Sequence, residues 1–187
     1  IPLTLLSYKF FLSTLGVEEF SKWILYFSFT LLSGFFLFGS QYELEQEIIQ
    51  TKRLNLFVSK KIDPFFNILI IGLFCISLCS LLIFYFINSI EIPLFCLLIL
   101  LALLINVQTF LRSILSGFGD LKFFYNTISI FKVIEVALSI FLVFLTKNIH
   151  AIPLAIIFCL LFQIYFLNTR LKKTYNLRIT SDMRNIM

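Results

Sequence analysis

A lysine and a glutamate stand three residues apart inside an apolar run, residues 126–145, that is long enough to cross a bilayer as a helix. At this spacing Lys132 and Glu135 can pair on one helix face. A charge at the centre of a spanning helix costs roughly 2.5–3.5 kcal/mol, so a charge that is kept there usually faces protein or a water-filled path. The pair could therefore line a hydrated cavity. The alternative is a self-neutralised pair that only lowers the cost of inserting the helix.

The polar residues of this run gather on one side of the predicted helix, within an arc of about 120° at the helical period. These residues are Ser129, Lys132, Glu135, Ser139 and Thr146. In the preceding apolar run Gln108, Thr109 and Arg112 also share a face, which favours the cavity, although Arg112 could extend to the membrane surface instead. The candidate cavity-lining residues are therefore Ser129, Lys132, Glu135, Ser139, Gln108 and Arg112.

Catalytic and metal-binding groupings are not evident in the sequence. The single histidine, His150, has no serine, cysteine or paired carboxylate at a catalytic spacing, which favours a solvated histidine. All four cysteines lie in apolar runs without a histidine or carboxylate that would complete a metal site, so we expect them to serve packing. They are Cys75, Cys79, Cys96 and Cys159. We expect no enzymatic activity, no cofactor and no metal.

A glycine-containing segment, Ser116-Gly-Phe-Gly-Asp120, separates two of the apolar runs. It lacks the preceding strand and the following Lys-Ser/Thr of a phosphate-binding loop. We expect a tight turn in which Gly117 and Gly119 permit positive φ.

The composition is that of an integral membrane protein: of the 187 residues 60% are hydrophobic and 13% charged, and the mean hydropathy is +1.01. The net charge of +5 lies largely in loops and tail, where it suits a membrane surface better than a nucleic acid. The chain begins at Ile1 with an apolar run and shows no signal peptide. We expect it to be a fragment of a longer protein.

Hydropathy divides this all-α chain into one incomplete transmembrane domain. Residues 1–14 are shorter than the roughly 20 residues of a spanning helix, and we expect them to be the end of a truncated one; the alternative is an interfacial helix. Five full spans follow, at about residues 23–40, 65–88, 93–113, 122–146 and 151–168, with a tail at 169–187. Trp23 and Tyr26 are typical of an aromatic belt at the membrane surface. Asp63-Pro64, Pro93 and Pro153 mark helix starts.

The loops differ in their basic residues. Eleven of the fifteen lysines and arginines lie in residues 41–63, in the turn around 112–122 and in the tail, whereas the opposite loops hold two. Because lysine and arginine in short loops stay cytoplasmic, residues 41–63, the turn at 114–121 and the tail are predicted to be cytoplasmic. Three loops would then lie outside, at residues 15–22, 88–92 and 147–151. The first of these is predicted to be a polar turn. The charged segment 41–63 is either a helix at the membrane surface, without a clean apolar stripe, or a solvated connector.

Several short motifs, in order along the chain, carry a family resemblance. They are Leu15-Gly-Val-Glu-Glu-Phe before an aromatic-rich span, Phe38-Gly39 before a charged helix, and Arg112-Ser-Ile-Leu-Ser-Gly-Phe-Gly119 with Tyr125 nearby. With these motifs the chain resembles bacterial polysaccharide transporters, the O-antigen flippases of the multidrug/oligosaccharidyl-lipid/polysaccharide exporter superfamily. The resemblance implies about twelve helices in two six-helix bundles around a central cavity, of which this chain supplies the end of the first helix and helices two to six.

The same resemblance implies an activity in the bacterial inner membrane. A flippase of this family moves polyprenyl-pyrophosphate-linked oligosaccharide from the cytoplasmic to the periplasmic leaflet during surface polysaccharide (lipopolysaccharide O-antigen) biosynthesis, by alternating access. Its partners would be the lipid-linked oligosaccharide, membrane lipid and H⁺ or Na⁺ as coupling ion, and no nucleic acid. Lys132 would contact the anionic head group, and Glu135 would orient the lysine or take part in ion coupling. The alternatives are a drug or cation antiporter of the same superfamily and an integral-membrane polymerase or acyltransferase.

Overall fold

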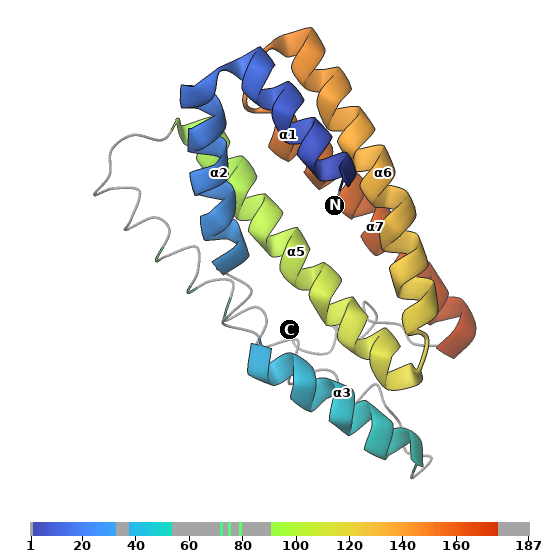
Figure 1. The fold of residues 1–187 in the computed structure, drawn as a ribbon. Helices are drawn as coiled ribbons and strands as arrows, with labels where there is room; N and C mark the ends of the chain where they lie inside the picture. The colour runs from blue at the N-terminus through green and yellow to red at the C-terminus, as the bar shows by residue number, and fades with distance from the viewer. Residues whose placement is uncertain are drawn as a thin grey trace.

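The computed structural model of the chain describes residues 2–32, 38–53 and 91–175, with the single positions 72, 75 and 79. Every element in these ranges is an α-helix (Figure 1), which confirms the all-α class. The helices are α1 (Pro2–Leu15), α2 (Val17–Leu32), α3 (Phe38–Arg53), α5 (Ile92–Phe118), α6 (Leu121–Thr146) and α7 (Ala151–Tyr175). Apart from these three single positions, the span predicted at 65–88 falls outside the described residues, as does the end of the tail.

Three of these helices, α5, α6 and α7, are long and apolar enough to cross a membrane. They have 27, 26 and 25 residues, and at about 1.5 Å per residue even 25 residues exceed the roughly 30 Å of a hydrocarbon core. Their positions agree with the spans predicted at 93–113, 122–146 and 151–168, although α5 and α7 continue further. The described part thus supports a membrane protein with three spanning helices, and the five-span count is not confirmed.

The joint between α1 and α2 is a single residue, Gly16, in the left-handed region at φ 84°. The predicted polar turn at 15–22 is therefore wrong, because α2 already begins at Val17. Glu18 and Glu19 lie in its first turn, where carboxylates favour the helix dipole. Lys22 forms an ion pair with each of them, with its Nζ 2.8 Å from Glu19 Oε1 and 3.0 Å from Glu18 Oε1. These contacts raise the pKa of Lys22.

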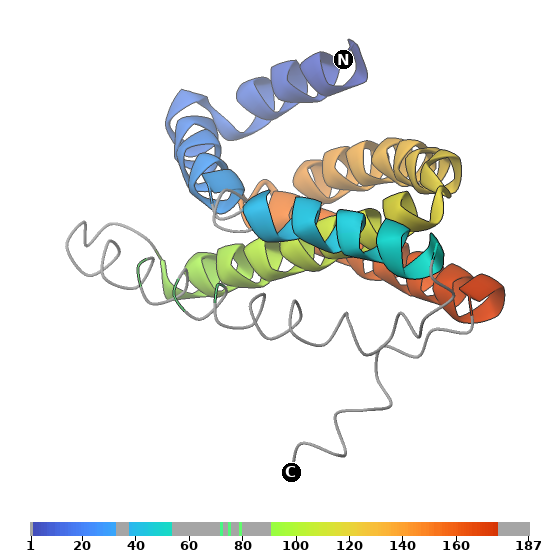
Figure 2. The same cartoon turned by 90° about the horizontal axis from the view of Figure 1, so that it is seen from below.

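Helix α3 lies across one end of the bundle, against α5 (Figures 1 and 2). It starts at Phe38, three residues before the predicted loop, and Leu44 and Ile48, one helical turn apart, are fully buried. The structure therefore gives this helix the apolar stripe that the sequence did not reveal. A hydrogen bond from the Ser116 hydroxyl to Glu45 Oε1, at 2.5 Å, also joins α3 to α5.

The two glycines of the turn after α5 differ in their roles. Gly119 ends α5 in the left-handed conformation, at φ 81°, and its N–H bonds to the carbonyls of Leu115 and Ser116, so the predicted turn is confirmed there. Gly117 lies inside the helix, and the expected positive φ is wrong for it. A Cβ built on Gly117 would stand 2.7 Å from Ile48 Cγ2, so this glycine permits the close approach of α3.

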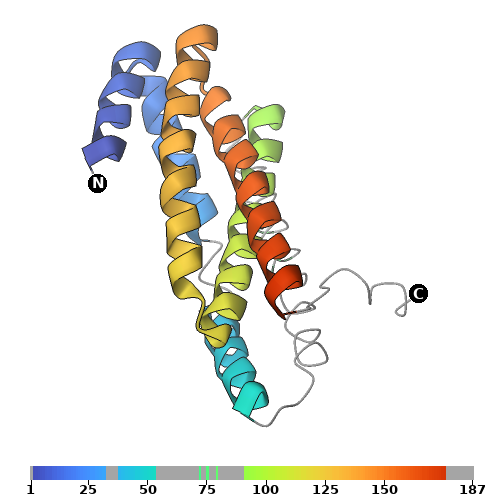
Figure 3. The ribbon, with the colours of Figure 1, turned by 90° about the vertical axis from the view of Figure 1, so that its right-hand side faces the viewer.

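Two hydrophobic clusters lie toward opposite ends of the long helices. One joins α1 and α2 to the first half of α5, the end of α6 and the start of α7. The other joins α3 to the second half of α5, the start of α6 and the end of α7. Figure 3 shows α6 and α7 running antiparallel between these ends. The α1–α2 joint and the α6–α7 loop thus share one end, while α3 and the α5–α6 turn share the other.

Candidate functional site

The ion pair predicted on α6 is present. Lys132 Nζ donates to Glu135 Oε1 at 2.5 Å. The Glu135 side chain is 10% exposed and that of Lys132 is 49% exposed. The carboxylate is thus enclosed by protein, while the ammonium group lies at the edge of the enclosed region.

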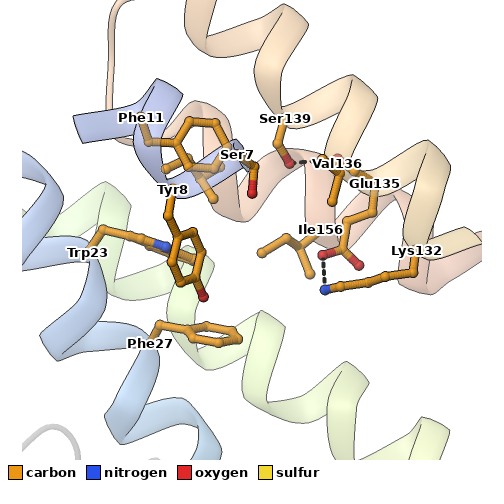
Figure 4. A pocket seen from close by; sticks show the side chains of 11 residues that line it. Ser7, Tyr8, Phe11, Trp23, Phe27, Lys132, Glu135, Val136, Ser139 and Ile156 are labelled. Atoms are coloured by element: carbon orange, nitrogen blue, oxygen red, sulfur yellow. Dashed lines mark hydrogen bonds and ion pairs between the residues drawn. The ribbon is translucent and has the colours of Figure 1, made fainter. Parts of the chain in front are cut away.

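A pocket of about 50 Å³ lies next to this pair (Figure 4). Four helices line it, with Ser7, Tyr8 and Phe11 from α1, Trp23 and Phe27 from α2, Lys132, Glu135, Val136 and Ser139 from α6, and Ile152 and Ile156 from α7. Its volume is enough for a few water-sized molecules at polar positions. Residues more than a hundred positions apart in the chain therefore meet at the ion pair.

The wall opposite the ion pair is aromatic. Trp23 is 2% exposed, and its indole stacks on the Phe27 ring with centroids 5.2 Å apart. Tyr26 is buried as well, so the two residues predicted to form an aromatic belt at the membrane surface belong to the protein core instead. Figure 4 shows Tyr8, Trp23 and Phe27 on one side of the pocket and Lys132 with Glu135 on the other.

The polar stripe predicted on α6 is divided by the structure. Ser139 is buried at the pocket, and its hydroxyl donates to the Glu135 carbonyl oxygen at 2.7 Å. Ser129 and Thr146 are exposed, and their hydroxyls donate to backbone carbonyls of their own helix. Only the middle of the stripe therefore faces the pocket among the described residues.

The polar face of α5 does not line this pocket. The expectation that Gln108 and Arg112 share one cavity with the polar residues of α6 is therefore wrong for this pocket. The side-chain amide of Gln108 donates a hydrogen bond to Oε1 of Gln163 on α7. Gln163 is 2% exposed. Arg112 is exposed, donates to the Tyr125 hydroxyl at 2.9 Å and lies over the Tyr125 ring, 5.7 Å from its centroid. The α5 polar residues thus bind α7 and the start of α6.

Sequence reasoning missed Ser7 and Tyr8 on α1 and Gln163 on α7. Ser7 and Tyr8 lie in an apolar run that was assigned only as a truncated helix, and a helical wheel does not show which other helix it faces. Gln163 is a lone amide in a spanning run, and that amide was the available signal, because a polar group in an apolar environment usually finds a hydrogen-bond partner.

The remaining charged contacts lie at the two ends of the bundle. At the α3 end, Arg170 donates to Asp120 at 2.9 Å and lies over the Phe123 ring, 5.0 Å from its centroid. At the other end, His150 Nε2 lies 3.1 Å from Glu91 Oε2, so this histidine has a carboxylate neighbour that the sequence did not indicate. The searched residues contain no group of three histidines, cysteines or carboxylates that could hold a metal.

The arrangement can do two things chemically. A half-exposed lysine beside a small pocket can bind an anion, and a buried carboxylate next to it competes for the same ammonium group. No family model, curated protein or solved structure matches this chain. The family resemblance therefore rests on the residues quoted for it.

Proposed function

We propose that the chain is part of a membrane transporter that flips a polyprenyl-pyrophosphate-linked oligosaccharide across the bacterial inner membrane by alternating access. The observation that carries the proposal is the Lys132–Glu135 pair, held in a long apolar helix at a pocket walled by four helices. A self-neutralised pair could face protein on any side. A pair beside a pocket, with the ammonium half exposed, is suited to exchange its carboxylate for a ligand anion.

The substrate class comes from the family resemblance, and electrostatics supports it. A pyrophosphate linked to a sugar loses its hydration in hydrocarbon, and transfer of an unpaired ion into a low-dielectric medium is costly. A lysine at the edge of the pocket, such as Lys132, can replace part of that hydration. In this proposal Lys132 leaves its ion pair with Glu135 and contacts the phosphate. Glu135 then takes part in coupling to H⁺ or Na⁺. Ser139 stays hydrogen-bonded to the α6 backbone.

The sidedness of the proposal draws on the fold. Helix α3, the α5–α6 turn with the helix ends next to it, and the end of α7 lie at one end of the bundle, and they carry seven of the eleven basic residues in the described part of the chain. We assign this end to the cytoplasm by the positive-inside rule. The site on α6 then faces a path between the two leaflets.

The test is flipping by the full-length protein in proteoliposomes, with Lys132→Ala compared with Lys132→Arg. We expect the alanine variant to lose at least about tenfold in rate, since charge-assisted contacts contribute roughly 1.5–3 kcal/mol, and the arginine variant to keep most of it. Lys147→Ala, which removes an exposed lysine at the end of α6, is the matched control. Unchanged flipping by Lys132→Ala at normal expression contradicts the proposal.

A cation or drug antiporter is the second candidate, because Glu135 is the more buried partner of the pair. It predicts that an organic cation, and not a lipid-linked sugar, is transported. Glu135→Gln would then abolish exchange while Lys132→Ala would not.

A further inference from the structure

The pocket combines two kinds of wall, and the proposed function uses only one of them. The charged wall comes from α6, and the aromatic wall comes from Tyr8 on α1 with Trp23 and Phe27 on α2. A phosphate would need the lysine and nearby hydroxyl groups. The three aromatic rings on the opposite wall are not needed to bind a phosphate.

These rings are not placed as lipid-facing side chains. Trp23 is 2% exposed and Tyr8 and Phe27 are partly buried, whereas aromatic residues such as Phe141 on α6 are 57% exposed on the outer surface of the described bundle. The protein therefore turns part of its aromatic surface inward, toward a buried carboxylate and an ammonium group. A ligand with an apolar ring face next to charges and hydroxyls matches both walls.

A hexose phosphate is such a ligand. The C–H face of a pyranose ring is apolar and packs on an aromatic ring, while its hydroxyls bond to carboxylates and its phosphate to a cation. We propose that Tyr8, Trp23 and Phe27 form a sugar subsite, in which the hexose next to the phosphate packs on the aromatic wall and Glu135 accepts a hydroxyl hydrogen bond. This inference rests on the proposed function, since Lys132 holds the phosphate.

The subsite is small in this structure. Its volume of about 50 Å³ is well below the roughly 300 Å³ at which ligand pockets begin. Helix α1 packs on α2 and α6 in the described part of the chain, and its Tyr8 and Phe11 fill the side facing α6. Sugar binding therefore moves α1 away from α6 and separates Tyr8 from the ion pair.

The test compares two probes on the full-length protein in nanodiscs, a short-chain prenyl pyrophosphate and the same lipid carrying one hexose. Trp23 is the single tryptophan of these 187 residues, so emission that disappears in Trp23→Phe reports on the subsite. We expect the hexose to tighten binding roughly three- to tenfold, the range that one aromatic contact supplies. Only the hexose-bearing probe should change the Trp23 emission.

Substitutions then separate the subsite from the phosphate contact. Trp23→Leu should remove the preference for the hexose-bearing probe while Trp23→Phe retains it, and Tyr8→Leu against Tyr8→Phe repeats the comparison if Trp23→Leu does not fold. Lys132→Met should weaken both probes equally, and Phe141→Leu should change neither.

Equal affinity of the wild type for both probes overturns the subsite and leaves the proposed function standing. If Trp23→Leu and Tyr8→Leu weaken the binding of both probes equally, the subsite is also overturned. That result shows that these side chains only pack the bundle and do not contact the hexose. Failure of the wild type to bind either probe refutes the proposed function and the subsite together.

Discussion

Replacing Gly117 by alanine should loosen the packing of α3 on α5 while the long helices stay intact. The added Cβ would stand 2.7 Å from Ile48 Cγ2, 2.8 Å from Ile48 Cβ and 3.3 Å from the Glu45 carbonyl oxygen. Two of these three atoms belong to or adjoin the α3 backbone, so a side-chain rotation cannot relieve the contact. Helix α3 must move as a body.

The expected cost follows from two opposing terms. Overpacking of this kind costs about 1–3 kcal/mol, and alanine in place of glycine inside a helix returns about 1 kcal/mol. The net loss of about 0–2 kcal/mol falls on the α3–α5 contact, because among the described helices α5 is the one that α3 approaches most closely. Gly117→Val, with a larger side chain, should cost more.

Hydrogen–deuterium exchange of the full-length protein measures this directly. We expect α3 amides to exchange up to about thirtyfold faster in Gly117→Ala, since 1.4 kcal/mol is a factor of ten and the net loss reaches about 2 kcal/mol, while the middle of α6 is unchanged. Ser116→Ala is the neighbouring control, because it removes the hydrogen bond to Glu45 without adding an atom.

Second-site changes at Ile48 give the sharper result. Ile48→Ala removes the atom at 2.7 Å but keeps the Cβ at 2.8 Å, so it should rescue Gly117→Ala in part, and Ile48→Gly should rescue it further. The double variants should be less destabilised than the sum of the single ones, by about 0.5–3 kcal/mol. Additive effects, or equal acceleration in α3 and α6, would show that Gly117 does not set the distance between these helices.

Three further changes follow from described contacts and can be measured as melting temperatures in detergent. Gln108→Leu leaves the buried Gln163 amide without its partner and should cost about 1–3 kcal/mol, whereas the double leucine variant should recover most of it. Lys147 has φ 49° at the end of α6, so Lys147→Gly should raise stability by up to about 1–2 kcal/mol, and a lower melting temperature would contradict this. Arg170→Lys keeps the charge near Asp120 but loses the planar group over Phe123, and a loss of about 0.5–1 kcal/mol is expected.

Hydropathy and helical spacing were enough to predict the three long helices and the Lys132–Glu135 pair, because both depend on residues within one segment. The surroundings of the pair depend on distant residues. The helical wheel placed Gln108 on a polar face of α5 but did not say that Gln163 on α7 would meet it. In the same way Trp23 has the composition of a membrane-surface anchor, and only the packing of α1, α2 and α6 shows that it is buried at the pocket.

Gly117 illustrates the same limit at a single position. Glycine before a turn is consistent with positive φ, and the sequence offered no reason to prefer close helix packing. The distinction depends on where Ile48 lies, almost 70 residues earlier in the chain.

The distance in the chain between Ile48 and Gly117 also determines the order in which these residues are synthesised. Ile48 is made well before the surface of α5 that buries it, and at about 5–20 residues per second the intervening stretch of about 70 residues takes on the order of 4–14 s to emerge. During this interval the α5 surface that buries Leu44 and Ile48 in the folded chain has not yet been made. The three glutamates of α3, Glu43, Glu45 and Glu47, favour a hydrated position for this helix until the α5 surface that buries Leu44 and Ile48 has emerged.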